Sequence, residues 1–469
     1  MLFSGIPFLF CFLPVFMIIY IIVPRRMKNI ALLMGSLFFY AWGEPRYVIL
    51  MIIQISINYI LGLLIEYSYE VKNNKKMAKG YMIISVIFGL GILGYYKYAD
   101  FFIENFNNIT GLNIELLKVA LPVGISFYTF QTLSYTIDVY RRQVKAQKNY
   151  INLAMYITMF PQLIAGPIVR YTDIKAKLTD REYSMEQIAY GIRRLVIGLF
   201  KKVIIANTLG EIVVQYNNTD EKTVIYTWIY AISVSLQLYY DFSGYSDMAI
   251  GLGSMLGFDF PENFRHPFEA KSATEFWRKW HITLGSFFRD YLYIPLGGNR
   301  VGNIRYIFNI LIVWMATGLW HGAAWNFVIW GLYFAVFLII EKYILKTYLE
   351  KTKIVGHIYL CIIVMISFVI FSADNIASGI DTICMMFGHS VALSGIKTLY
   401  CIKNYGIIIL MAVIGSTHIP ISIYMRAKKI KYIDKIMDVC EVVAIMLIMV
   451  AVTAFLVSGS YNPFLYFRF

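Results

Sequence analysis

Long apolar runs recur along this chain and decide what it can fold into. Over 469 residues, 59% are hydrophobic, only 15% are charged, and the mean hydropathy is +0.62, outside the range of soluble globular domains. The sequence therefore predicts an all-α polytopic membrane protein. Several runs are short, which favours tilted, broken or re-entrant helices. The runs lie at residues 6–23, 48–65, 81–96, 225–240, 304–320, 327–340, 358–371, 407–419 and 442–457.

The positive charge sits in the short segments between these runs. A net charge of +14 alone would also suit a nucleic-acid binder, but Lys and Arg gathered in short connections follow the positive-inside pattern of membrane proteins. We expect these clusters to be cytoplasmic and the protein to bind no nucleic acid. The clusters lie at residues 25–28, 72–79, 141–148, 193–202, 265–305, 342–353 and 426–431.

These constraints predict one membrane domain over residues 1–469, with about twelve crossings and both termini outside. The count requires residues 154–167 to be re-entrant. Residues 259–305 are too polar for hydrocarbon and are predicted to lie on the cytoplasmic side. The first apolar run lacks a basic leader and a cleavage site, so we read it as a retained span. Outer connections are too short for a catalytic domain, and chemistry on a large outside substrate would need a partner.

His321 is the candidate that stands out among six histidines. It lies in WMATGLWHGAAW, between two apolar runs, where an ionisable group is costly and marks a functional site by default. The flanking Gly318 and Gly322 allow close backbone approach, and Asn326 is a possible second polar group. The alternative is a buried structural histidine.

His281 is the second candidate, in the string FWRKWH. Its cationic neighbours Arg278 and Lys279 are expected to lower its pKa and to favour the neutral ring. A neutral imidazole in a low-dielectric site can act as the general base of acyl transfer. The alternative is an interfacial ring held by hydrogen bonds. The remaining histidines are expected to be structural (His266) or solvated near span ends: His357, His389 and His418.

Other chemistries find little support. Ser243, in DFSGYSDM, lacks a nucleophile-elbow motif and is expected to stand in a packed polar turn. The histidines lack the spacing of metal ligands, so no metal site is predicted. The five cysteines are widely separated and predict no disulfide framework.

Several long strings together resemble the membrane-bound O-acyltransferase family. They are DFSGYSD at 241–247, GFDFPENFRHPF, TEFWRKWHITLGSFFRDYLYIPLGGNR, TGLWHGAAWNFVIWG, and MFPQLIAGPIVRY at 159–171. Together with the ending NPFLYFRF, they are most similar to the membrane subunit of alginate and peptidoglycan O-acetyltransferases. The strings follow one another over nearly the whole chain.

The resemblance implies a fold and catalytic residues. The fold would be a ring of tilted helices around a thin core, with a cytoplasmic opening for the acyl donor and an extracellular funnel for the acceptor. The family's membrane-embedded histidine falls on His321 and its second histidine on His281. Many relatives have Asn at the second position, which makes that role less general.

The resemblance also implies a donor, which in this branch is cytoplasmic acetyl-CoA, with no permanently bound cofactor. Four basic residues are placed where its phosphates would arrive, and Arg suits phosphate geometry. Topology or lipid-headgroup contact is the alternative for each. They are Arg278, Lys279, Arg289 and Arg300.

At the other end, residues 462–469 are expected to be an extracellular aromatic tail. A similar motif ends a small membrane protein of the related D-alanyl transfer system, and by that analogy Tyr466 would relay or orient the acyl group. The alternative is an interfacial aromatic belt.

The expected function is acetyl transfer across the bacterial plasma membrane to an extracellular polysaccharide or cell-wall polymer. An extracytoplasmic SGNH-hydrolase-like partner would complete the transfer. Two other functions remain open. One is D-alanylation of teichoic acid from a carrier-protein thioester, and the other is transport of a polymer precursor, for which the paired halves typical of transporters are not apparent.

Overall fold

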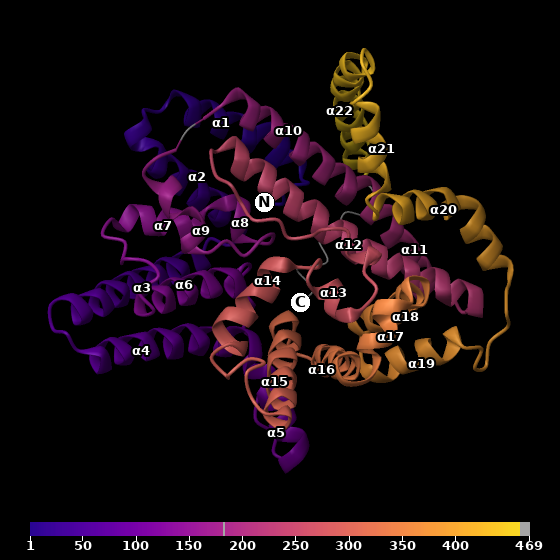
Figure 1. Ribbon diagram of the computed structural model, residues 1–469, viewed down its shortest axis with the longest axis horizontal. Helices are drawn as coiled ribbons and strands as arrows, with labels where there is room; N and C mark the ends of the chain where they lie inside the picture. The colour runs from indigo at the N-terminus through magenta and orange to yellow at the C-terminus, as the bar shows by residue number, and fades with distance from the viewer. Residues whose placement is uncertain (182, 460–469) are drawn as a thin grey trace. The chain divides into compact units, whose positions relative to one another are not determined.

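The computed structural model describes residues 1–181 and 183–459, and these residues form helices and no strands (Figure 1). The predicted all-α class is confirmed. The chain divides into two compact units. Unit 1 comprises Met1–Arg194 and Met248–Pro261, and unit 2 comprises Leu195–Asp247 and Glu262–Phe469.

Unit 1 holds the N-terminal helices and short 3-10 or π segments between them. Its elements are η1 (Pro7–Phe12), α1 (Leu13–Ile22), η2 (Arg25–Met27), α2 (Lys28–Gly43), α3 (Tyr47–Glu70), α4 (Lys75–Leu93), η3 (Gly94–Tyr98), α5 (Ala99–Thr110), α6 (Ile125–Tyr140), α7 (Tyr150–Thr158), α8 (Phe160–Leu163), α9 (Tyr171–Ile174) and η4 (Lys175–Leu178). Most of α10 (Met185–Leu199) also belongs to it.

Helices α3, α4 and α6 pack side by side and are held by buried polar side chains (Figure 1). Gln54 donates to the hydroxyls of Thr129 and Thr132, at 3.1 and 3.3 Å. Ser85 bonds Asn58 at 2.6 Å and Thr136 at 2.7 Å. These hydrogen bonds give the buried polar side chains partners that lipid hydrocarbon could not offer. They therefore fix which faces of the three helices meet.

The segment at residues 154–167 is broken, as a re-entrant segment requires. Helix α7 ends at Thr158, and Pro161 stands in the first turn of the four-residue helix α8, where its missing N–H costs nothing. The whole segment is buried. Whether it crosses the membrane stays a prediction.

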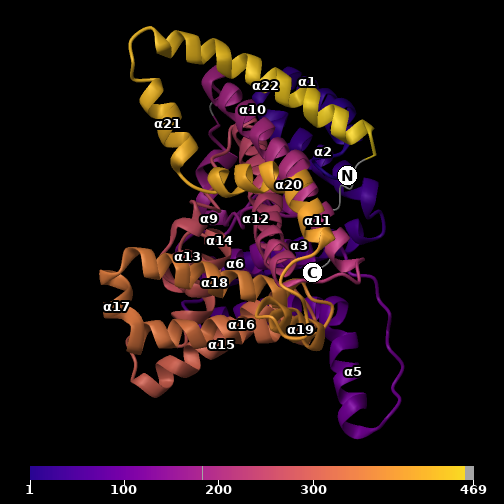
Figure 2. The same ribbon diagram turned by 90° about the vertical axis from the view of Figure 1, so that its right-hand side faces the viewer.

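Unit 2 holds the remaining helices, and it contains both candidate histidines. Its elements are η5 (Phe200–Ala206), α11 (Asn207–Asn217), most of α12 (Val224–Met255), η6 (Pro267–Glu269), α13 (Ala273–Trp277), α14 (Ile282–Phe288), η7 (Arg289–Tyr293), α15 (Asn303–His321), α16 (Trp325–Ile340), η8 (Glu341–Leu345), α17 (Lys346–Lys351), α18 (Lys353–Ser372), α19 (Ile376–Met386), α20 (Ile396–Gly415), α21 (Ile419–Ala427) and α22 (Ile433–Val457). Figure 2 shows α17 at the turn that joins α16 to α18.

A buried ion pair links η5 to α12 in unit 2. Lys202 Nζ lies 2.7 Å from Asp241 Oδ1 and 3.0 Å from Asn207 Oδ1, and both charged side chains are at most 4% exposed. The π-helical turn approaches α12 closely where Gly244 faces it, because a Cβ there would lie 3.1 Å from both Lys201 Cβ and the backbone nitrogen of Lys202. The string DFSGYSD thus supplies both an acid and a contact glycine to this crossing.

Six helices of the described residues are long and apolar enough to cross a membrane, which makes the protein multi-pass. The predicted total of about twelve crossings includes shorter or more polar helices and remains a prediction. The six are Tyr47–Glu70, Lys75–Thr110, Trp325–Leu349, Lys353–Ser372, Ile396–Gly415 and Ile433–Val457.

Two expectations on helix extent are corrected. The run 225–240 does not end in a polar turn, because α12 continues to Met255 and places Ser243 in a helix interior. The run 407–419 is likewise misplaced, since α20 begins at Ile396 and ends at Gly415. In α12 the polar Asp241 and Ser243 are buried and stay helical, whereas in α20 Lys397 and Lys403 are exposed and helical, so local polarity was a poor guide to helix extent in both.

Candidate active site

The site is built on the hairpin of α15 and α16, which touch backbone to backbone. A Cβ added to Gly318 would lie 2.2 Å from the carbonyl oxygen of Phe327, and one added to Gly331 would lie 2.2 Å from that of Trp314. Residue 314 thus opposes 331 and 318 opposes 327, so the helices run antiparallel. The predicted close approach at Gly318 is confirmed, and it sets the position of His321 one turn later.

Replacing Gly331 with alanine is expected to disrupt this hairpin, because the added methyl group meets backbone that cannot rotate away. Overpacking of this kind costs about 1–3 kcal/mol. The thermal midpoint in detergent should fall, and acyl transfer should fall with it. Gly80→Ala is the matched control: its Cβ would meet nothing within 4 Å, and it should be neutral or slightly stabilising. Equal midpoints for the two variants would contradict the packing argument.

His321 is the last residue of α15, and three aromatic rings surround it. Its ring centroid lies 5.0 Å from that of Trp320, 5.1 Å from that of Trp330 and 5.3 Å from that of Phe371, all at steep angles. Rings at such angles turn edges toward faces and hold an imidazole firmly. Asn326, the suggested second polar group, instead donates to the backbone carbonyls of Phe371 and Ala373.

His281 lies between α13 and α14, in the left-handed region with φ of 43°. Its side chain is 1% exposed. Its Nδ1 lies 3.1 Å from Asn263 Oδ1, and its Nε2 is buried with no hydrogen-bond partner among the described residues. A strained, buried imidazole with one nitrogen engaged and the other unused is typical of a functional site.

Trp320 brings the two histidines together. The His281 ring lies 5.8 Å from the Trp320 ring, which in turn lies 5.0 Å from the His321 ring. Burial lowers the pKa of His281 well below its usual range, and the nearby His321 lowers it further. The direction agrees with the sequence-based expectation, but its cause differs: the sequence pointed to Arg278 and Lys279, whereas burial of the ring at the N-terminus of α14 dominates.

The four basic residues proposed for the donor lie on the segment that contains α13, α14 and η7. Lys279 pairs with Glu275 at 2.8 Å, and Arg289 pairs with Asp290 at 2.7 Å. Arg278, Arg289 and Arg300 are exposed. The structure places them on accessible surface, two of them already paired with acids of their own segment, and their role toward a donor stays a prediction.

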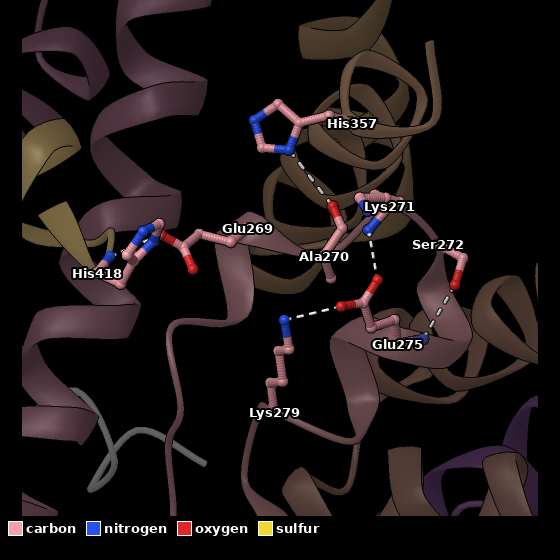
Figure 3. A network of polar contacts seen from close by, with 8 residues as sticks. All are labelled: Glu269, Ala270, Lys271, Ser272, Glu275, Lys279, His357 and His418. Carbon is pink, nitrogen blue, oxygen red and sulfur yellow. Dashed lines mark hydrogen bonds and ion pairs between the residues drawn. The ribbon is translucent and has the colours of Figure 1, made fainter. Parts of the chain in front are cut away.

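The start of this segment is ordered by a polar network (Figure 3). Glu275 accepts from the backbone of Lys271 and from Lys279, and Glu269 bonds both the ring and the backbone N–H of His418. Partial burial raises the pKa of Glu269, but the bonds from His418 outweigh it and leave the pKa below its ordinary value. Within the predicted loop 259–305, the stretch that carries this network is therefore an ordered part of unit 2.

The other histidines are placed as follows. His357 contacts the Ala270 carbonyl through Nδ1 at 3.3 Å, and His389 contacts the adjacent Ser390. His266 stands at the N-cap position of η6 with φ of 45°, without a side-chain capping bond. With His418 on Glu269, two histidines expected to be merely solvated bind the ordered segment. Tyr466 lies outside the described residues.

Sequence reasoning missed the partners of the two histidines. Asn263 is fully buried beside His281, and its only signal was its place in the string PENF, 18 residues earlier. Phe371 comes from the end of α18, where nothing in the sequence marks it.

The site of this all-α membrane protein thus holds a buried imidazole, His281, and a half-buried one, His321, whose rings both lie against Trp320, an arrangement that suits proton transfer. The model of the membrane-bound O-acyltransferase family matches residues 138–380, more than half of the chain and including both histidines. The chain belongs to this family, and it is therefore a membrane-bound O-acyltransferase.

Individual proteins of known description are also similar to this chain. The chain is 34% identical to the probable alginate O-acetylase AlgI of Azotobacter vinelandii, over 100% of both chains. It is also 34% identical to the peptidoglycan O-acetyltransferase of Helicobacter pylori, over 86% of this chain and 82% of the relative. A teichoic acid D-alanyltransferase of Bacillus subtilis is 31% identical, but over only 46% of this chain and 58% of the relative.

Proposed function

We propose that this protein moves acetyl groups from cytoplasmic acetyl-CoA across the bacterial plasma membrane for O-acetylation of an extracellular polysaccharide or cell-wall polymer. The single observation that carries the proposal is the pair of imidazoles on either side of Trp320. Names of full-length relatives favour acetyl as the group and a polymer as the acceptor.

The chemistry assigned to His321 is general-base catalysis. The imidazole takes the proton of the attacking hydroxyl, a C–O bond forms at the acetyl carbon, the C–S bond breaks, and the proton passes to the thiolate to give free CoA. Aromatic rings lie on three sides of the half-buried His321, and this apolar wall would strengthen the electrostatic interactions within the site.

The positive-inside pattern supports a cytoplasmic donor. Arg278, Lys279, Arg289 and Arg300 are assigned to attract its phosphates. On the other face, an SGNH-hydrolase-like partner would accept the acetyl group and pass it to the polymer, with Tyr466 helping to orient it.

Acetyl transfer is preferred to D-alanyl transfer because relatives named as acetyltransferases match the whole chain or most of it, whereas the D-alanyltransferase matches less than half. No observation favours transport of a polymer precursor.

Sidedness provides the test. Inside-out membrane vesicles that contain the protein, partner and polymer should incorporate label from radioactive acetyl-CoA added outside, because their cytoplasmic face is accessible. Right-side-out vesicles should incorporate at least about tenfold less. Equal incorporation in both preparations, or incorporation only from a D-alanyl carrier-protein thioester, would overturn the proposal.

A further inference from the structure

We infer that Asn263 is a positioning residue that holds His281 in a single tautomer, with the proton on Nδ1 and a free lone pair on Nε2. The inference deepens the proposed function, on which it rests, because it assigns His281 the role of a fixed hydrogen-bond and proton acceptor. Asn263 reaches the reaction only through His281.

The orientation of the Asn263 amide is fixed by its other partners. Oδ1 lies 3.3 Å from the backbone N–H of Thr283 and 2.9 Å from its hydroxyl, and Nδ2 lies 3.1 Å from Ser246 Oγ. A backbone N–H can only donate, so the amide atom facing it is oxygen. That same oxygen faces His281 Nδ1 at 3.1 Å. An acceptor-only oxygen requires a donor opposite it, so Nδ1 carries the proton.

The surroundings leave neither residue room to turn. Asn263 is fully buried, and its own carbonyl oxygen accepts from the backbone N–H of Ile282 at 3.0 Å. Phe242 packs against the His281 ring at 4.6 Å with an interplanar angle of 87°. The left-handed backbone at His281 persists because these contacts over-determine it.

What remains is Nε2, buried and without a hydrogen-bond partner among residues 1–181 and 183–459. A neutral imidazole nitrogen without a proton accepts from a thiol or a hydroxyl. These are the two proton-bearing groups of thioester alcoholysis. The ligand class that fits His281 is therefore a thiol or hydroxyl donor, and a cationic ring is disfavoured by its burial.

An amide at position 263 matters for charge as well as for geometry. Aspartate would offer the same accepting oxygen to Nδ1 and Thr283, but its negative charge would favour the imidazolium form. Asn263→Asp therefore changes the protonation of His281 while keeping its position. Asn263→Ala removes the hydrogen bond to His281 Nδ1 altogether.

The test measures initial rates of label transfer from acetyl-CoA in vesicles between pH 5 and 9. Asn263→Asp should move the acidic limb of the profile to higher pH while activity at high pH is largely retained. Asn263→Ala should lose on the order of 10²-fold in rate at every pH, with KM for acetyl-CoA little changed, as expected for lost acid–base positioning. An unmoved acidic limb in Asn263→Asp would overturn the inference.

Two further measurements separate positioning from folding. In a His281→Ala background, Asn263→Ala should cost nothing more, whereas a purely structural role predicts an additive loss. Nitrogen-15 NMR of histidine-labelled wild-type protein should show one ring with a protonated Nδ1, assigned by its disappearance in His281→Gln. A protonated Nε2 in that ring would overturn the inference whatever the acyl donor, so its failure is distinguishable from failure of the proposed function.

Discussion

Replacing His321 with alanine is expected to reduce acetyl transfer by about 10²- to 10⁴-fold, the usual contribution of a general base. The helix should survive, because alanine is the best helix former and His321 is the last residue of α15. The measurement is release of free CoA thiol by purified protein with partner and acceptor, together with ester-linked acetate on the polymer of cells carrying the variant.

His357→Ala is the matched control, since it removes an exposed imidazole whose hydrogen-bond contacts among the described residues are with the Ala270 carbonyl and Cys361. Its transfer rate should stay within about twofold of wild type, as expected for a residue outside the chemistry. Normal acetate in the His321→Ala strain would exclude His321 as the base. Equal losses in both variants would point to general damage instead.

Breaking the Lys202–Asp241 pair is expected to have the largest effect on stability. Lys202→Met leaves the Asp241 carboxylate buried without its cation, and removal of one partner from a buried pair costs about 3–5 kcal/mol. The thermal midpoint in detergent should fall sharply and expression should fall with it. The double variant Lys202→Met, Asp241→Leu should recover most of the loss, because no uncompensated charge remains.

The neighbouring pair of Lys201 and Asp247 is the control. It has a similar distance, 2.6 Å, but its side chains are 23% (Lys201) and 9% (Asp247) exposed, against 3% and 4% in the Lys202–Asp241 pair, so water reaches the carboxylate left behind more readily. Lys201→Met should therefore lower the midpoint less than Lys202→Met does. A larger loss at Lys201 would show that burial does not govern these charges.

Much of the fold was predictable because a bilayer leaves few options to an apolar segment. The runs 48–65 and 442–457 lie within α3 and α22, where apolar composition and helix coincide. Ser243 shows the limit. Its polar neighbours favour a turn locally, but Asp241 finds Lys202 on another element and the helix continues. An ion pair between distant segments produces no periodic pattern in the sequence, so the continued helix could not be predicted from it.

The sequence pointed to both histidines of the candidate site, and their catalytic roles stay predictions. His321 was marked by its cost in an apolar setting and His281 by its motif, and the structure brings both to Trp320. The sequence did not point to Asn263, because asparagine is common in polar segments. Its role depends on the fold, which places His281 and Thr283, 18 and 20 residues later, against its side chain. The inferred role of Asn263 depends on which atoms donate and which accept in its hydrogen bonds, and a sequence does not contain that information.

The glycine contact between α15 and α16 also limits how this enzyme can move. The two backbones are in direct contact at Gly318 and Gly331. Sliding or rotating one helix against the other would therefore displace the carbonyl groups of its partner. We therefore expect α15 and α16 to move together as one rigid body, with His321 at the end of α15. Movements that admit a donor or release a product are therefore expected in the segments that flank the hairpin, and substitutions there should alter turnover while His321 keeps its place.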